Sequence, residues 1–275
     1  MPYQDILVFL DDGTTNDTRV KSGFKLAKQH DASLTGVALA TMKPRKVKTD
    51  SSMVRRRMSQ EMAEKLVGEF TDQALREGVA AKSIIIAGNA DESTVKMAHY
   101  SHNYDLLILR QPNPDHENYS RLTQLSETIL LKSGRPILFM PYIGTEKCPG
   151  ERVMISWDGT AAACRAVHNA IPVLQNASEV VLLIVENDKT RANLPTAIVE
   201  GFVEHLHNHG VQVTVRRVLQ GTYDIATVIL NEIAETGTDL LIMGGYGKPS
   251  FQQKIFGGVT RSILSSMIIP VLMSH

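Results

Sequence analysis

The chain has 275 residues, 43% of them hydrophobic and 21% charged, as expected for a globular protein of one or two domains. Lysines plus arginines equal aspartates plus glutamates at 29 each, so the overall charge favours neither nucleic-acid nor membrane binding. There is no secretory signal pattern, no apolar run of the roughly 20 residues that a membrane span needs, and no cysteine motif. We therefore expect a cytoplasmic protein.

An internal repeat organises the chain. Residues 5–39 and 151–185 each contain an apolar strand pattern, the triplet Asp-Gly-Thr, a helical stretch and a second apolar run. Asp12 aligns with Asp158 at an offset of 146. Further along, the run DLLIL from Asp105 matches DLLIM from Asp239 at an offset of 134, so the first copy is longer in its middle. The chain is thus predicted to hold two copies of one unit.

Short apolar runs alternate with longer segments of helical period in both copies. In the first copy, strands are predicted at 5–10, 33–39, 82–87, 105–109 and 136–140, with a long helix over 52–77. In the second, strands are predicted at 152–157, 180–185, 211–218, 239–243 and 269–273. This pattern predicts an α/β fold with two tandem doubly wound domains. Each would be a five-stranded parallel sheet of order 3-2-1-4-5, with helices on both faces.

The predicted domain boundaries follow from the repeat. The first domain is expected over residues 1–142 and the second over 151–275, with a linker at 143–150 that contains a proline and two glycines. Each copy ends in an apolar strand that would otherwise be an exposed edge. We therefore expect the halves to pack as an internal pseudo-dimer, and a homodimer of two chains could form in addition.

A glycine-rich stretch, GGYGKPSFQQKIFGGVTR, follows the fourth predicted strand of the second copy at residues 244–261. It could be a wide surface turn or a cradle for phosphate. Gly244 and Gly247 would permit positive φ and close approach of backbone N–H groups to an anion. Ligands of open parallel sheets bind where the strand order reverses, here between the first and fourth strands. Asp158, at the end of the first strand, should therefore lie beside this stretch.

The spacing of Gly244, Gly247 and Gly257 resembles the pattern GxxGx9G(S/T) of the universal stress protein family, and the whole chain resembles a tandem of two such domains. The resemblance implies that the second domain binds ATP or a related adenine nucleotide, with Mg²⁺ as a possible companion. It implies that the nucleoside is held by Asp158 and Val185. Ribose and phosphates would be held by Gly244, Gly247, Gly257, Gly258, Val259 and Thr260. Gly258 stands where the motif has Ser or Thr, so Thr260 is the hydroxyl that could replace it.

The first copy departs from this pattern. The positions aligned with the glycines carry Arg110, Asn113, Thr123 and Gln124, and the loop also contains two prolines. The first domain is therefore predicted to lack a triphosphate site. Asp11 and Asp12 are interpreted as a solvated strand end, although a different small ligand in that crevice stays open.

The sequence offers little for catalysis or metal binding. No nucleophile paired with a base is predicted at the crevice, and Cys164 is interpreted as a small core residue. His205 and His209 share a helix face and could ligate Zn²⁺, but two histidines are fewer ligands than zinc normally has. A polar helix end capped by Gly210 is the favoured interpretation, so no metal site is predicted.

The resemblance therefore implies a cytoplasmic stress-response protein that binds adenine nucleotide and acts as a nucleotide-dependent switch or partner-binding module. One alternative is a nucleotide-free interaction scaffold. Another is a slow ATP hydrolase, although enzymatic activity is not the expected role. The expected partners are a nucleotide and an unidentified protein, with no nucleic acid and no membrane.

Overall fold

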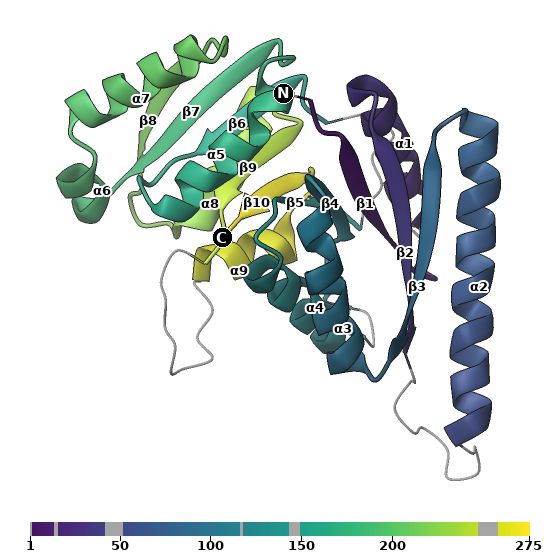
Figure 1. Ribbon diagram of the computed structural model, residues 1–275. Helices are drawn as coiled ribbons and strands as arrows, with labels where there is room; N and C mark the ends of the chain where they lie inside the picture. Colours follow the sequence, from purple (N-terminus) through teal and green to yellow (C-terminus); the bar gives the residue numbers. More distant parts are fainter. Residues whose placement is uncertain (1, 14–15, 42–51, 116–117, 143–148, 247–257) are drawn as a thin grey trace. The chain divides into compact units, whose positions relative to one another are not determined.

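Strands and helices alternate in both halves of the chain (Figure 1). The structure is a computed structural model and describes residues 2–13, 16–41, 52–115, 118–142, 149–246 and 258–275. The first half contains β1 (Asp5–Leu10), α1 (Asn16–His30), β2 (Ser33–Thr41), α2 (Ser52–Glu77), β3 (Ala81–Gly88), α3 (Ala90–Tyr100), the 3₁₀ helix η1 (Ser101–Asn103), β4 (Leu106–Arg110), α4 (Tyr119–Lys132) and β5 (Ile137–Met140). The second half contains β6 (Arg152–Ser156), α5 (Ala161–Leu174), β7 (Glu179–Glu186), α6 (Asp188–Asn193), α7 (Thr196–Asn208), β8 (Thr214–Leu219), α8 (Ile225–Thr236), β9 (Leu240–Gly244), α9 (Gly258–Ser266) and β10 (Val271–Ser274).

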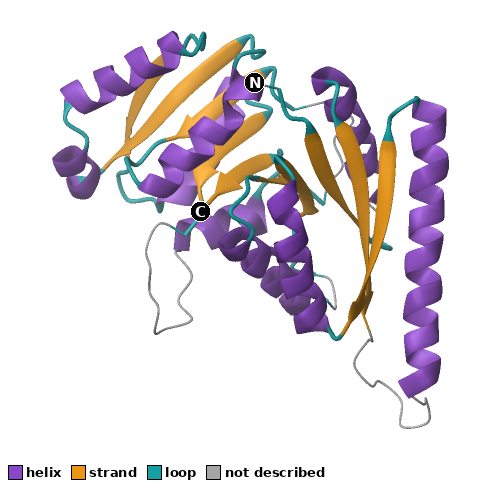
Figure 2. Ribbon diagram, in the orientation of Figure 1, coloured by secondary structure: helices purple, strands orange, loops and turns teal. Residues whose placement is uncertain are grey.

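The strand order confirms the predicted doubly wound topology. It is β3-β2-β1-β4-β5 in the first repeat and β8-β7-β6-β9-β10 in the second. β1 pairs in parallel with β2 and β4, and β6 pairs in parallel with β7 and β9. The strands are layered with helices (Figure 2), and β2 and β3 lie between α2 and α3. Central strands covered in this way have a continuous apolar interior, as in β7, where six buried apolar residues lie between two terminal glutamates.

The main difference from the predicted strand bounds is at β8, which begins at Thr214 rather than at residue 211. The preceding residues complete the end of α7 instead. Gly210 has φ 76°, and Val211 donates its backbone N–H to the Leu206 carbonyl at 3.0 Å. Val211 is also buried, which gives this helix end the apolar contact typical of a glycine cap.

The long helix α2 covers β2 and β3 through its small and aromatic residues. Phe70 is buried and stacks on Phe24 of α1 with ring centroids 5.5 Å apart. Gly36 of β2 makes room for this ring, since a Cβ at that position would lie 2.8 Å from Phe70. Among the helices of the described ranges, none combines the length and the apolar character needed to cross a bilayer.

The final strands of the two repeats pair with each other. β10 is antiparallel to β5, with Val271 opposite Phe139, and parallel to β9. The compact units consequently differ from the repeats. One contains Pro2–Arg135 and Tyr142–Glu146, whereas the other contains Pro136–Pro141, which includes β5, together with Lys147–His275. Of the predicted linker, only residues 149 and 150 lie in the described part of the chain.

Candidate functional site

The carboxyl ends of β6, β7 and β9 lie side by side at one edge of the second repeat. Ser156 of β6 is in register with Leu183 of β7 and with Met243 of β9. Asp158 lies two residues beyond Ser156, just after the end of β6, and Val185 lies two residues beyond Leu183 within β7, so both lie close to the start of the glycine-rich stretch. The strand order reverses between β6 and β9, which is where open α/β sheets bind ligands. The structure thus brings these predicted site residues to one edge.

The turn between β6 and α5 fixes the carboxylate of Asp158. Its Oδ1 atom accepts hydrogen bonds from the Thr160 backbone N–H at 3.1 Å and the Thr160 hydroxyl at 2.7 Å. Thr160 is also the N-cap of α5 and accepts from the Ala163 N–H at 3.3 Å. Gly159 between them has φ 73°, and a Cβ there would lie 2.6 Å from Leu194. The Asp158 side chain is exposed, and the hydrogen bonds of its own turn fix its orientation.

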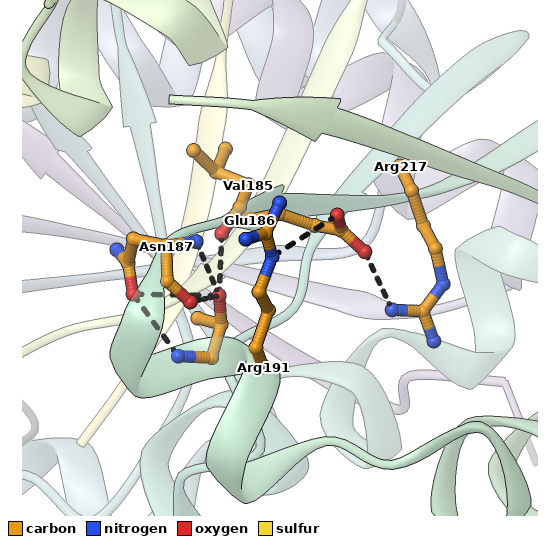
Figure 3. Close-up of polar contacts among 6 residues, drawn as sticks. Val185, Glu186, Asn187, Arg191 and Arg217 are labelled. Carbon is orange, nitrogen blue, oxygen red and sulfur yellow. Dashed lines mark hydrogen bonds and ion pairs between the residues drawn. The ribbon is translucent and has the colours of Figure 1, made fainter. Parts of the chain in front are cut away.

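The end of β7 is held by a compact hydrogen-bond network (Figure 3). The Val185 carbonyl accepts from the Thr190 hydroxyl at 2.9 Å, and Asn187 and Thr190 form the capping box that starts α6. Glu186 is paired with Arg217 at 3.0 Å and with Arg191 at 3.7 Å. One lone pair of the Val185 carbonyl is thus occupied, and a carbonyl oxygen has two.

Gly244 ends β9 and allows a close approach of two backbones. A Cβ at this position would lie 2.5 Å from the Ala163 backbone nitrogen and 2.8 Å from the Ala162 carbonyl carbon, both in the first turn of α5. The expectation of positive φ at Gly244 is wrong, because it is Tyr246 that adopts φ 51°. Glycine is needed at 244 because no side chain fits there, whereas the sharp turn falls two residues later.

The first turn of α9 contains Gly258, Val259 and Thr260. At Gly258 an added Cβ would meet no atom of the described residues within 4 Å. Thr260 is 4% exposed, and its hydroxyl accepts from the Tyr246 backbone N–H at 3.2 Å. This hydroxyl therefore joins the end of β9 to α9 rather than projecting into solvent. Gly247 and Gly257 lie outside the described residues.

Replacing Thr260 by valine is expected to destabilise this junction by about 1–3 kcal/mol, because the buried Tyr246 N–H loses its acceptor while the side-chain shape is kept. Thr260→Ser keeps the hydroxyl and is the matched control. Urea unfolding of both variants measures the difference. Equal stabilities would show that the hydroxyl contributes nothing at this position.

Trp157, the single tryptophan of the chain, lines this edge and was not predicted as part of the site. It is 6% exposed, and its ring stacks on Phe202 of α7 at 3.8 Å with an interplanar angle of 13°. Its buried indole N–H has no acceptor among the residues that the structure describes. The sequence shows a tryptophan next to Asp158. It does not show that Phe202 is its stacking partner, because the two residues lie far apart in the chain.

The equivalent edge of the first repeat contains a buried ion-pair cluster. Asp11 accepts from Arg19 at 3.2 Å and from Arg110 at 3.1 Å. Arg110, which replaces Gly244, also fills the space over Gly13, where a Cβ would lie 2.4 Å from its Nη1. The interpretation of Asp11 as a solvated strand end is therefore wrong, because two buried guanidinium groups enclose its carboxylate. Asp12, which follows it, is exposed.

The strand order, with its reversal between β6 and β9, defines an open, doubly wound α/β protein built from two copies of one domain. Residues 151–275 match the model of the universal stress protein family. The second repeat therefore contains a domain of this family. No curated relative matches the chain at a significant level.

Two solved structures resemble the chain over nearly its whole length. A universal stress protein from Archaeoglobus fulgidus DSM 4304 is 18% identical, with a TM-score of 0.76 over 98% of this chain and 97% of that one. A functionally unknown protein from Pseudomonas aeruginosa PAO1 is 12% identical, with a TM-score of 0.59 over 98% of this chain and 92% of that one. At these identities the likeness establishes the tandem fold.

Proposed function

We propose that the second repeat binds ATP or a related adenine nucleotide and acts as a cytoplasmic, nucleotide-dependent switch in the stress response. The observation that carries this proposal is the arrangement of Asp158, Val185 and the first turn of α9 around one strand-order reversal. A switch also needs a protein partner, which the nucleotide-dependent surface would recognise.

Each part of the edge suits one part of a nucleotide. Within the described residues, Oδ2 of Asp158 makes no hydrogen bond, so it could accept from ribose hydroxyls while Thr160 holds Oδ1. The backbone at Val185 would meet the base. The N–H groups of Gly258 and Val259 begin a helix, and no atom of the described residues crowds Gly258, which suits phosphate oxygens. Mg²⁺ would bind together with the phosphates.

Gly244 and Thr260 have supporting roles in this proposal. Gly244 lets the end of β9 approach α5, and Thr260 fixes α9 to Tyr246. Gly247 and Gly257 would contribute backbone donors from the loop between them. We propose binding rather than catalysis as the function of this edge.

Isothermal titration calorimetry with Mg-ATP tests the proposal. Asp158→Ala should weaken binding by about tenfold or more, since it removes a charged acceptor. Asp12→Ala changes the aligned residue of the first repeat and should leave the affinity unchanged. Absence of binding by the wild-type chain would favour the interaction scaffold. ADP release that stops in Asp158→Ala would instead favour the slow hydrolase.

A further inference from the structure

Three histidines from two helices gather on the surface of the second repeat. His205 and His209 lie one turn apart at the end of α7, as the sequence indicates, and α5 adds His168. The Nε2 atoms of His168 and His205 are 3.0 Å apart. The ring centroid of His205 lies 5.0 Å from that of His168 and 4.6 Å from that of His209. The ring centroids of His168 and His209 are 6.5 Å apart.

A hydrogen bond fixes the tautomer of His168. Its Nδ1 atom lies 2.8 Å from the Cys164 carbonyl oxygen, which can only accept, so Nδ1 carries the hydrogen. In the neutral ring Nε2 therefore accepts the hydrogen bond from Nε2 of His205, and a metal ion would take the place of the hydrogen between the two rings. A ring N–H bound to a backbone carbonyl is the outer-shell arrangement that orients histidine ligands of metals.

The helices that carry the three rings are fixed to each other. Gln175, at the end of α5, donates to the His209 carbonyl at 2.8 Å. Phe202, one turn before His205, stacks on the buried Trp157. The rings also surround the carboxyl end of α7, where the helix dipole favours positive charge. The scaffold is thus preorganised, and its local electrostatic field suits a cation.

We propose that His168, His205 and His209 bind a divalent transition-metal ion, for which Zn²⁺ is the natural probe because imidazole is one of its preferred ligands. With Zn–N distances of about 2.0–2.1 Å, tetrahedral ligand nitrogens lie roughly 3.3–3.4 Å apart, close to the 3.0 Å between His168 and His205. As the side chains stand, no group of three in the described ranges is placed to hold a metal ion, so the proposed site requires the His209 ring to rotate. Water would supply the fourth ligand.

A bound ion would join α5 to α7 beside Trp157. This proposal does not depend on nucleotide binding.

The test uses the full chain, without a histidine tag and stripped with chelator, titrated with Zn²⁺ by calorimetry at pH 7.5. One equivalent should bind. His168→Gln, His205→Gln and His209→Gln should each weaken binding by at least about tenfold. His207→Gln is the matched control, since it removes an exposed histidine of the same helix from outside the cluster. Far-ultraviolet circular dichroism checks that each variant is folded.

Quenching of Trp157 by Cu²⁺ gives a second, spatial readout. Phe202 lies between the indole and His205, with centroids 3.8 Å and 6.3 Å away, so a bound paramagnetic ion would quench the only tryptophan. The three glutamine variants should lose this quenching and His207→Gln should keep it. The proposal is overturned if the wild-type chain takes up no stoichiometric Zn²⁺. It is also overturned if any of the three variants binds like wild type, or if His207→Gln is as defective as they are.

Discussion

Asp11→Ala is expected to destabilise the unit that contains β1 to β4 by about 3–5 kcal/mol. The substitution leaves Arg19, 1% exposed, and Arg110, 7% exposed, without the carboxylate that they share. An uncompensated buried charge is among the largest single costs in a protein. Urea unfolding followed by circular dichroism measures the loss, and hydrogen exchange of β1 and α1 locates it.

Two further variants separate charge from packing. Asp12→Ala alters the exposed neighbour and should change stability by no more than about 0.5 kcal/mol. Combining Asp11→Ala with Arg110→Met removes one of the two arginines that Asp11→Ala leaves without a carboxylate. The double variant should therefore regain part of the lost stability. If Asp11→Ala costs less than about 1 kcal/mol, the cluster is not the stabilising element that its geometry indicates.

The contribution of Asp11 should also depend on pH. Burial raises the pKa of Asp11, but Arg19, Arg110 and the Gly13 N–H more than offset it, so the pKa lies below its ordinary 3.8. A carboxylate whose pKa is lower in the folded state than in the unfolded state stabilises the fold. This stabilisation is complete above the unfolded-state pKa and is lost as the pH falls through the folded-state pKa. The difference between wild type and Asp11→Ala should be constant from about pH 5 to 7 and should shrink below pH 3.8.

Gly244→Ala should cost about 1–3 kcal/mol through overpacking. The new Cβ would lie 2.5 Å and 2.8 Å from backbone atoms of Ala163 and Ala162, which cannot move without shifting the start of α5. That shift would displace the turn that orients Asp158, so ATP affinity should fall together with stability. Thermal unfolding and calorimetry on the same samples measure both effects.

Gly258→Ala is the matched control within the same glycine-rich stretch. Its Cβ would meet no atom of the described residues within 4 Å, and alanine is a better helix former than glycine. Stability should therefore be unchanged or higher by up to about 1 kcal/mol. Equal destabilisation by the two substitutions would contradict the distinction between a packing glycine and an exposed one.

Much of the fold was predictable because its signals are local. The apolar runs and their spacing predicted all ten strands within a few residues, and the repeat predicted the topology of both halves. The edge that holds Asp158 and the start of the glycine-rich stretch was predictable for the same reason. Parallel strands place their carboxyl ends at one edge, whatever the side chains.

The sequence by itself determined the doubly wound fold, the duplication and the edge where Asp158, Val185 and the glycine-rich stretch meet. The tertiary structure decided what individual residues do there. Gly244 is needed for close packing, Thr260 is bound to Tyr246, and Asp11 is enclosed by two arginines. It also added His168 to the pair of histidines on α7. The physical reason is that periodicity reports which face of an element is buried, whereas these roles depend on contacts between segments far apart in the chain.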